Sequence, residues 1–421
     1  MLRYNINPKR NIFYKTAFDI RYLILCFMVM VYPLIVIPNP YNNYFYFPRY
    51  VILAIISIII IYSILREKVR FNLRHPVFIP LGFFLLFGLL STVLAPYPFT
   101  AWVGFDIYEG TTARFTGFST CIFCALLFLI AYNTKQSKNI LYYMVITATI
   151  VSFLGLLQHF GINFIPHEDF RTGIRSYSTM GNPNFFGTYT VFILPATMLL
   201  YFFTGKKQWL ISTALIYSGL LICVTRGVWI AFFFAFIVIS VYILRHKDMR
   251  KKYLTMVFLL IIVTGILLPT SNGLIYKRIF SIPDQIEASV KMEDDGGSYR
   301  IYIWKESAKL IPQNWAFGIG PEHLGYADIR PKINLADKVH NVYLEIIVTM
   351  GAFAFLSYIL FLGYFLKPWK NEFGLIYFIM IFSYLLQGIF NIDVIMVMPL
   401  FWIVLGLSLS NEKHLKSHIY T

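Results

Sequence analysis

Residues 341–366 read NVYLEIIVTMGAFAFLSYILFLGYFL, and His340 stands directly before them. Glu345 is the only charged residue in this stretch. A helix of about 20 apolar residues is long enough to cross the hydrocarbon core of a bilayer. The stretch is therefore predicted to be a transmembrane helix. Its apolar run is continuous rather than alternating, which disfavours the strands of a membrane β-barrel.

The composition of the whole chain agrees with this stretch. Of the 421 residues, 58% are hydrophobic and 13% are charged, whereas soluble domains have about 45–50% and about 25%. These values exclude a soluble enzyme, a disordered chain and a disulfide-stapled secreted domain. We predict an all-α polytopic membrane protein with about 12 transmembrane helices. The segments are 21–38, 50–65, 77–95, 115–132, 140–158, 183–203, 208–224, 227–244, 253–269, 341–366, 374–390 and 393–410.

The distribution of charge predicts which side of the membrane each connection occupies. Of the 36 Lys and Arg residues, 22 fall in the N-terminal segment, the C-terminal tail and every second connection between them. Only 5 of the 20 acidic residues lie in these parts. Because Lys and Arg accumulate on the cytoplasmic side, both termini are predicted to be cytoplasmic. This also accounts for the net charge of +16 without nucleic acid as a partner.

The domain organisation follows from these segments. Residues 1–269 are predicted to hold helices one to nine and residues 341–421 helices ten to twelve. Residues 270–340 form one long extracytoplasmic loop, and loops of this length are usually functional. Tyr299–Ile311 is predicted to be an amphipathic helix, with Ile301, Trp304, Ala308 and Ile311 on one stripe. This helix could lie on the membrane surface or cover the helix bundle.

Ionisable residues are almost absent from the middle of the predicted helices. Coupled transporters place carboxylates, histidines or arginines there, because their substrate crosses the midplane. Here the polar residues gather at the outer ends of the helices. The pattern favours a reaction at the outer membrane surface. A flippase or exporter is the alternative from another functional class.

Three residues on the predicted outer side could carry chemistry. Arg226 lies in a tight turn and is either an arginine that reaches the headgroups or a phosphate ligand. Arg300 is either a solvated helix charge or a second anion ligand. His340 is either a helix cap or a general base. A neutral ring at a helix N-terminus could accept a proton.

Further polar and aromatic residues are candidates for substrate contacts. The sequence Gly181-Asn182-Pro183-Asn184 begins a predicted helix, and its amides either start the helix or bind sugar and phosphate oxygens. Arg171 and Arg175 lie just upstream. Trp229, Trp304 and Asn341 accompany Arg226, Arg300 and His340 respectively. We find no metal-binding motif and no dinucleotide fingerprint, and we predict neither a metal nor a cofactor.

Three separated motifs together resemble the O-antigen ligase and O-antigen polymerase-like membrane glycosyltransferases, which include teichuronic acid polymerase-like proteins. The first is Gly181-Asn182-Pro183-Asn184 and the second is Arg226-Gly227-Val228-Trp229. The third runs from Gly297-Ser298-Tyr299-Arg300 through Gly318-Ile319-Gly320-Pro321 to His340-Asn341-Val342-Tyr343-Leu344-Glu345. Their order and spacing match over roughly residues 180–350, while each motif alone is weak.

This resemblance implies a C-type glycosyltransferase-like bundle in the bacterial plasma membrane, with its active site on the extracytoplasmic side. The donor would be a glycan on polyprenyl, commonly undecaprenyl, pyrophosphate. Arg226 and Arg300 would hold the pyrophosphate, and His340 would act as the base. The reaction would be metal-independent and would invert the anomeric carbon.

The resemblance leaves the acceptor open. A ligase would use a lipid-core hydroxyl, a polymerase the next repeat unit of O-antigen, capsule or teichuronic acid, and a protein O-oligosaccharyltransferase a Ser or Thr. The predicted partners are the bilayer, the lipid-linked donor and one such hydroxyl. The sequence indicates no oligomeric state.

Overall fold

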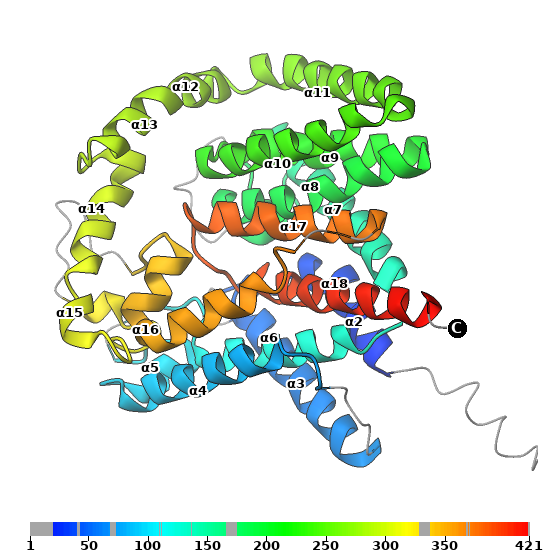
Figure 1. The fold of residues 1–421 in the computed structure, drawn as a ribbon. Helices are drawn as coiled ribbons and strands as arrows, with labels where there is room; N and C mark the ends of the chain where they lie inside the picture. The colour runs from blue at the N-terminus through cyan, green and yellow to red at the C-terminus, as the bar shows by residue number, and fades with distance from the viewer. Residues whose placement is uncertain are drawn as a thin grey trace, which may run out of the picture.

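The computed structural model describes residues 20–39, 43–67, 73–108, 110, 112–135, 137–165, 175–327, 337–367, 369 and 371–419. Within these residues the secondary structure is helical, apart from one isolated bridge between Phe105 and Ala113. The all-α prediction is therefore confirmed. The longer helices run side by side in one bundle, and α12 to α15 form an arc at its edge (Figure 1).

Twelve helices overlap the twelve predicted apolar segments, one helix to each segment. They are α2 (Ile20–Met30), α3 (Phe47–Glu67), α4 (Phe78–Leu94), α6 (Phe118–Tyr132), α7 (Ser137–His159), α8 (Pro183–Thr204), α9 (Lys207–Ile222), α10 (Arg226–Arg245), α11 (Arg250–Thr270), α16 (Val342–Gly363), α17 (Glu372–Gly388) and α18 (Met398–Ile419). The last predicted segment began at 393, whereas α18 begins five residues later.

Six helices in the described part of the chain are long and apolar enough to cross a membrane. They are Phe47–Arg66, Ser137–His159, Pro183–Thr204, Arg226–Arg245, Lys247–Thr270 and Val342–Gly363. Others are shorter: α2 has 11 residues, a length of about 17 Å against a hydrocarbon core of about 30 Å. A multi-pass membrane protein is thus supported, and the number of twelve spans stays a prediction.

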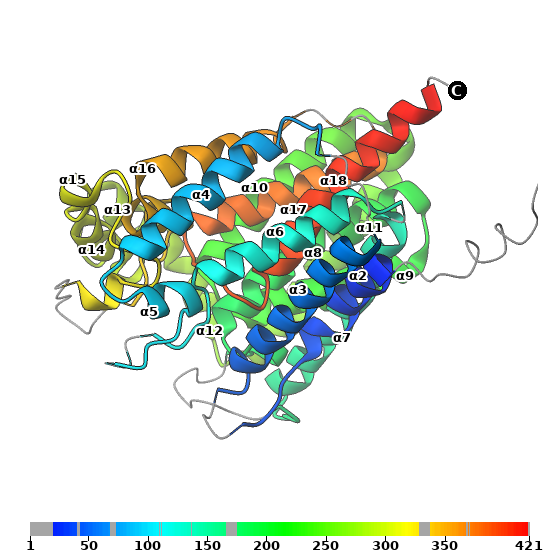
Figure 2. The same ribbon diagram turned by 90° about the horizontal axis from the view of Figure 1, so that it is seen from below.

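The core of the bundle is built around α8. Its apolar window is completely buried, and it packs against α7, α9, α10 and α17. On the periphery, α11 exposes large apolar side chains such as Leu254, Phe258 and Ile261. Large exposed apolar surfaces mark contact with lipid or with another protein. The first described residues of α2 and the end of α18 lie at the same end of the bundle (Figures 1 and 2), as expected if both termini share one side.

The predicted long loop 270–340 contains helices of its own. They are α12 (Leu274–Phe280), α13 (Ile282–Val290), α14 (Gly296–Ala308), α15 (Ile311–Asn314) and the 3₁₀ turn η5 (Leu324–Tyr326). With α5 (Pro98–Val103), helices α13 to α15 gather at the end of the bundle opposite the C-terminus (Figure 2). This end carries the candidate site.

The amphipathic helix predicted at 299–311 corresponds to α14, with two differences. Gly297, Ser298 and Tyr299 have φ between 62° and 65°, so regular helix begins only at Arg300. Ile301 is buried as predicted, but Ala308 is exposed and Ser307 is buried in its place. Trp304 and Ile311 pack against Val348 and neighbouring side chains. The helix therefore packs on the bundle, as one of the two alternatives from the sequence has it.

The glycine-rich stretch at 318–321 pairs with a break in α16. Gly351 has φ 82° and ψ 175°, which interrupts the helix and frees carbonyls for the loop. The Ile319 amide donates to the Val348 carbonyl at 3.1 Å, and the Gly320 amide to the Thr349 carbonyl at 2.9 Å. A Cβ on Gly318 would lie 2.3 Å from the Thr349 carbonyl carbon. Only glycine allows this close approach, so the motif fixes the loop beside α16.

Candidate active site

Four arginines and one histidine meet in a cavity of about 240 Å³. The residues come from five places in the chain: Arg175 before α8, Arg226 at the start of α10, Arg278 on α12, Arg300 on α14 and His340 before α16. The lining contains no carboxylate among the described residues. The structure thus brings together Arg226, Arg300 and His340, which sequence analysis had selected separately, and it adds Arg175 from the weaker candidates.

Arg226 spans the gap between the bundle and the arc of short helices. Its Nη1 donates to Ser281 Oγ at 3.1 Å, and its Nη2 to Gln285 Oε1 at 3.2 Å and Ser298 Oγ at 2.5 Å. All three acceptors are neutral, so the positive charge of Arg226 is not compensated by them. Val224, two residues before Arg226, has φ 51°, a costly conformation for a β-branched residue. Such strain clusters at functional sites.

Arg175 is held by the first turn of α8 and by the residues between α9 and α10. Its Nε donates to the Cys223 carbonyl at 3.0 Å, and Nη2 donates to Asn184 Oδ1 and Thr225 Oγ1, each at 2.9 Å. Asn184 also lines the cavity. Asn184 therefore positions an arginine, a role that the motif at 181–184 did not reveal.

Arg300 has one hydrogen bond from its guanidinium group and one buried nitrogen without a partner among the described residues. Its Nη1 donates to the Gly297 carbonyl at 3.1 Å, and its buried Nε has no hydrogen-bond partner within the described residues. Burial, and then the charges of Arg226, Arg278 and Arg175, lower the pKa of Arg300 from its ordinary value of 12.5 to about 10. The guanidinium is still charged at neutral pH, and an anion would relieve both the repulsion and the missing contact.

Sequence analysis missed Arg278. It follows Lys277 in a segment that looked like an ordinary solvated stretch of the long loop, and no neighbouring motif marks it. In the structure it lines the cavity with the other three arginines. Arg278 reaches the cavity because α12 lies near the start of α10. The sequence around Arg278 does not predict that arrangement of the two helices.

His340 occupies a strained turn that several contacts hold in place. Its φ is 58°, which is uncommon for a residue other than glycine. Trp304 Nε1 donates to the Val339 carbonyl at 3.1 Å. Asn341 Oδ1 accepts from the amides of Tyr343 and Leu344, both at 3.0 Å, and thereby caps α16. Trp304 and Asn341 thus hold the turn on either side of His340.

The imidazole of His340 is predominantly neutral. Burial, followed by the charges of Arg300 and Arg114, lowers the pKa of His340 from about 6.5 to about 4. This lowered pKa agrees with the neutral ring expected from the sequence, with burial as its first cause rather than the helix N-terminus. A neutral imidazole can accept a proton at physiological pH.

An apolar groove of about 400 Å³ adjoins the basic cavity. Arg226 and Arg300 line both spaces, so the groove ends at the cluster of positive charge. The apolar walls come from α10, α13, α14 and one residue after α17. They include Ile230, Ile282, Ile286, Val290, Met292, Ile301, Trp304 and Phe390. The two spaces together suit an amphiphile with a long apolar chain and an anionic head.

Other candidates lie away from the cavity or outside the described residues. Asn182 caps α8, since its Oδ1 accepts from the Asn184 amide at 2.8 Å. Trp229 Nε1 donates to the Leu220 carbonyl at 2.7 Å and the ring packs into the core. Neither residue is in the lining of the cavity or the groove. Arg171 lies outside the described residues. Direct substrate contact by these three residues stays a prediction.

No group of three or more His, Cys, Asp or Glu side chains in the described part of the chain is arranged to hold a metal ion. The positive charge in the basic cavity comes from guanidinium groups.

The shifted pKa of His340 predicts a pH-dependent loss of stability. Because the pKa is lower in the folded state than the ordinary value, the contribution of the neutral ring is complete above about pH 6.5. It is lost as the pH falls towards 4. The wild type should lose about 2–3 kcal/mol more than His340→Asn over this interval. Denaturant unfolding of both proteins in detergent at pH 7 and pH 4 measures the difference, and equal losses would contradict it.

A comparison with known protein families tests the resemblance that the motifs indicate. Residues 191–359 match the family described as O-antigen ligase. The match covers Arg226, Arg278, Arg300 and His340, whereas Arg175 and Asn184 of the cavity and Phe390 of the groove lie outside it. No curated protein matches the chain. The resemblance stated from the motifs is therefore confirmed, and it supports a membrane glycosyltransferase of the ligase or polymerase kind.

Proposed function

We propose that this O-antigen ligase-like chain transfers a glycan from a polyprenyl pyrophosphate donor to an acceptor hydroxyl at the outer face of the bacterial plasma membrane. The observation that supports this most directly is the junction of the apolar groove with the basic cavity at Arg226 and Arg300. A polyprenyl chain would lie in the groove, and the pyrophosphate would lie among the arginines.

In this proposal the arginines act on the leaving group. Pyrophosphate gains negative charge as its bond to the anomeric carbon breaks. Guanidinium groups already placed around its oxygens would stabilise that charge without rearrangement. Each charge-assisted hydrogen bond would contribute about 1.5–3 kcal/mol. Because the leaving group is good and the cations come from the chain, we propose that no metal is needed.

His340 acts on the acceptor. Its neutral ring would take the proton of the acceptor hydroxyl while that oxygen attacks the anomeric carbon from the side opposite the pyrophosphate. Attack from that side inverts the configuration. The same cavity holds the arginines and the histidine, so leaving group and acceptor would meet within one site. This convergence favours the enzyme over a flippase, which would need a polar path through the bilayer.

The proposal is tested by transfer in detergent with purified protein, a polyprenyl pyrophosphate-linked glycan and EDTA. A lipid-core acceptor, excess donor and a Ser/Thr peptide are offered in parallel. Product with one of them identifies a ligase, a polymerase or a protein oligosaccharyltransferase respectively. Donor binding without any product, together with donor translocation in proteoliposomes, would overturn the proposal in favour of the flippase.

The groove itself makes a separate prediction. Ile286 lines it and is 50% exposed, so Ile286→Asn should change stability little while removing apolar contact with a long donor chain. Full burial of such a side chain contributes about 1.5–3 kcal/mol. A donor would cover only the exposed half of Ile286, so we expect a loss of about 0.8–1.5 kcal/mol and a fall in donor affinity of about 4- to 13-fold. Affinity for a short-chain, water-soluble donor should stay constant. Ile279→Asn on α12, outside the groove lining, is the matched control, and equal effects of both variants would contradict the prediction.

A further inference from the structure

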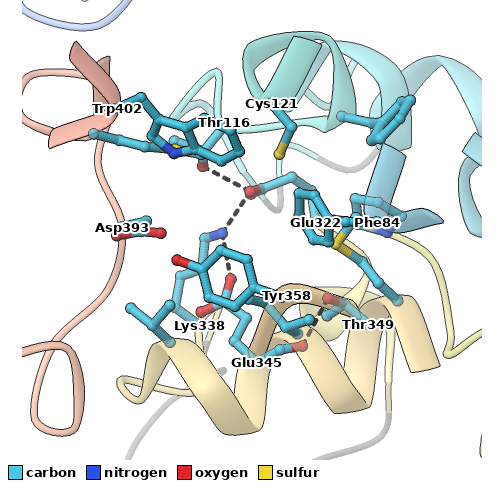
Figure 3. Close-up of a pocket in the computed structure, with 16 residues that line it drawn as sticks. Phe84, Thr116, Cys121, Glu322, Lys338, Glu345, Thr349, Tyr358, Asp393 and Trp402 are labelled. Atoms are coloured by element: carbon cyan, nitrogen blue, oxygen red, sulfur yellow. Dashed lines mark hydrogen bonds and ion pairs between the residues drawn. The ribbon is translucent and has the colours of Figure 1, made fainter. Parts of the chain in front are cut away.

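A buried ionic cluster lies behind the turn that carries His340. Lys338 Nζ is 2.5 Å from Glu322 Oε1 and 2.5 Å from Glu345 Oε1. The side chains of Lys338 and Glu322 are 5% and 1% exposed. Figure 3 shows Lys338 between the two carboxylates, one from the 318–323 loop and one from the first turn of α16.

Glu322 connects this cluster to a further segment of the chain. Its Oε1 accepts from Thr116 Oγ1 at 2.7 Å, and its Oε2 accepts from Thr112 Oγ1 at 3.0 Å. Lys338 therefore ties the His340 turn both to α16 and, through Glu322, to the segment before α6. Although burial lowers the pKa of Lys338, Glu322 and Glu345 outweigh it and raise that pKa. The ammonium group is accordingly charged.

Stability alone does not explain such a cluster. Taking ions out of water costs several kcal/mol each, and well-packed apolar residues of similar volume often give equal or greater stability. Lys338 is also unsuited to bind substrate directly. Its ammonium is occupied by two carboxylates, and it does not line the basic cavity or the apolar groove.

The contacts of the residues around Lys338 indicate that the cluster holds the turn that carries His340. His340 has φ 58°, and a strained residue keeps its conformation only where the surroundings over-determine it. Asp337 pairs with Arg114 at 2.7 Å, and Trp304 and Asn341 hold the positions on either side of His340. Lys338 is buried and binds two separate parts of the chain, Glu322 in the 318–323 loop and Glu345 in α16.

We propose that Lys338 is a positioning residue for His340, and that the buried pairs with Glu322 and Glu345 set the orientation of the imidazole. This inference rests on the proposed function, because the orientation of the ring affects the rate only if His340 is the base. The expected cost of losing it is large, since a displacement of about 1 Å at a reacting group can lower the rate about 100-fold.

The test uses a variant that removes the charges without leaving any of them unpaired. Lys338→Met alone strands two buried carboxylates and is expected to fold poorly. Lys338→Met/Glu322→Gln/Glu345→Gln keeps the shapes and should fold with a Tm near that of the wild type. For this variant we expect kcat about 100-fold lower with an unchanged KM for the donor. The single variant Lys338→Arg, with both glutamates intact, should keep much of the wild-type rate that the triple variant loses. Arginine keeps the positive charge, and a cavity of about 70 Å³ beside Lys338 can take its larger head group.

A second readout separates this inference from the proposed function. In protein labelled with ¹³C at histidine, the resonance of His340 is assigned with His340→Asn. The triple variant should shift or broaden this resonance, while Lys309→Met, which breaks the exposed pair with Glu306, should leave it in place. An unchanged resonance or an unchanged kcat in the triple variant would overturn the positioning role. If the resonance shifts in the triple variant but the wild type transfers no glycan, the proposed function is removed and the positioning role is kept.

Discussion

His340→Asn is expected to lower kcat for glycan transfer by about 100- to 10,000-fold, the range typical of losing a general base. Asparagine tolerates the positive φ at this position better than most residues, so the turn should keep its shape. Its amide cannot accept a proton at any relevant pH. The KM and binding affinity for the donor should change little, because the arginines that line the cavity remain. Steady-state kinetics and donor binding on the same preparation measure the two effects separately.

The control for this prediction is a histidine on a remote turn. His246 is exposed after α10, and its Nδ1 lies 2.8 Å from the Tyr242 carbonyl. His246→Asn should keep the wild-type rate. If His340→Asn transfers glycan within about two-fold of the wild-type kcat, His340 is not the base, and the proton must leave by another route.

The apolar segments could be located from the sequence because continuous apolar runs have few alternative structures. All twelve segments overlap a helix. Most boundaries agree within a few residues, but α2 ends at Met30 rather than at 38, and α18 ends at Ile419 rather than at 410. Details set by tertiary packing were less accessible. The predicted stripe on α14 assumed regular helix from Tyr299, yet the backbone there is left-handed, and Ser307 rather than Ala308 faces the bundle. The break at Gly351 could not be inferred, because it depends on pairing with a distant loop.

The candidate site shows the same division. Arg226, Arg300 and His340 were selected because each violates a local expectation of charge or position, or matches a motif, and the structure brings them into one cavity. Arg278 carries no local signal, since its role depends on where α12 lies. Lys338 was hidden for the same reason. A lysine in a polar loop usually faces water, and only the fold reveals that this one is buried between Glu322 and Glu345.

Arg300→Gln should lower the affinity for the donor without lowering the thermal stability of the protein. Without donor, burial and then the charges of the other arginines lower the pKa of Arg300, and none of the four arginines pairs with a carboxylate in the described part of the chain. Removing its charge should therefore leave Tm unchanged or raise it. Donor affinity should fall by about 10- to 150-fold, which corresponds to the loss of about 1.5–3 kcal/mol. Thermal unfolding and titration with polyprenyl pyrophosphate give the two quantities.

Arg226→Gln provides the companion measurement, with its control on the same helix. Arg226 and Arg245 are the first and last residues of α10, and Arg245 does not line the cavity or the groove. Arg226→Gln should weaken donor binding by a similar factor but also lose its contacts with Ser281, Gln285 and Ser298. Its Tm should therefore lie below that of Arg300→Gln. Arg245→Gln should bind the donor as the wild type does. If all three variants weaken binding equally, the effect is one of net charge, and the junction of groove and cavity is not the donor site.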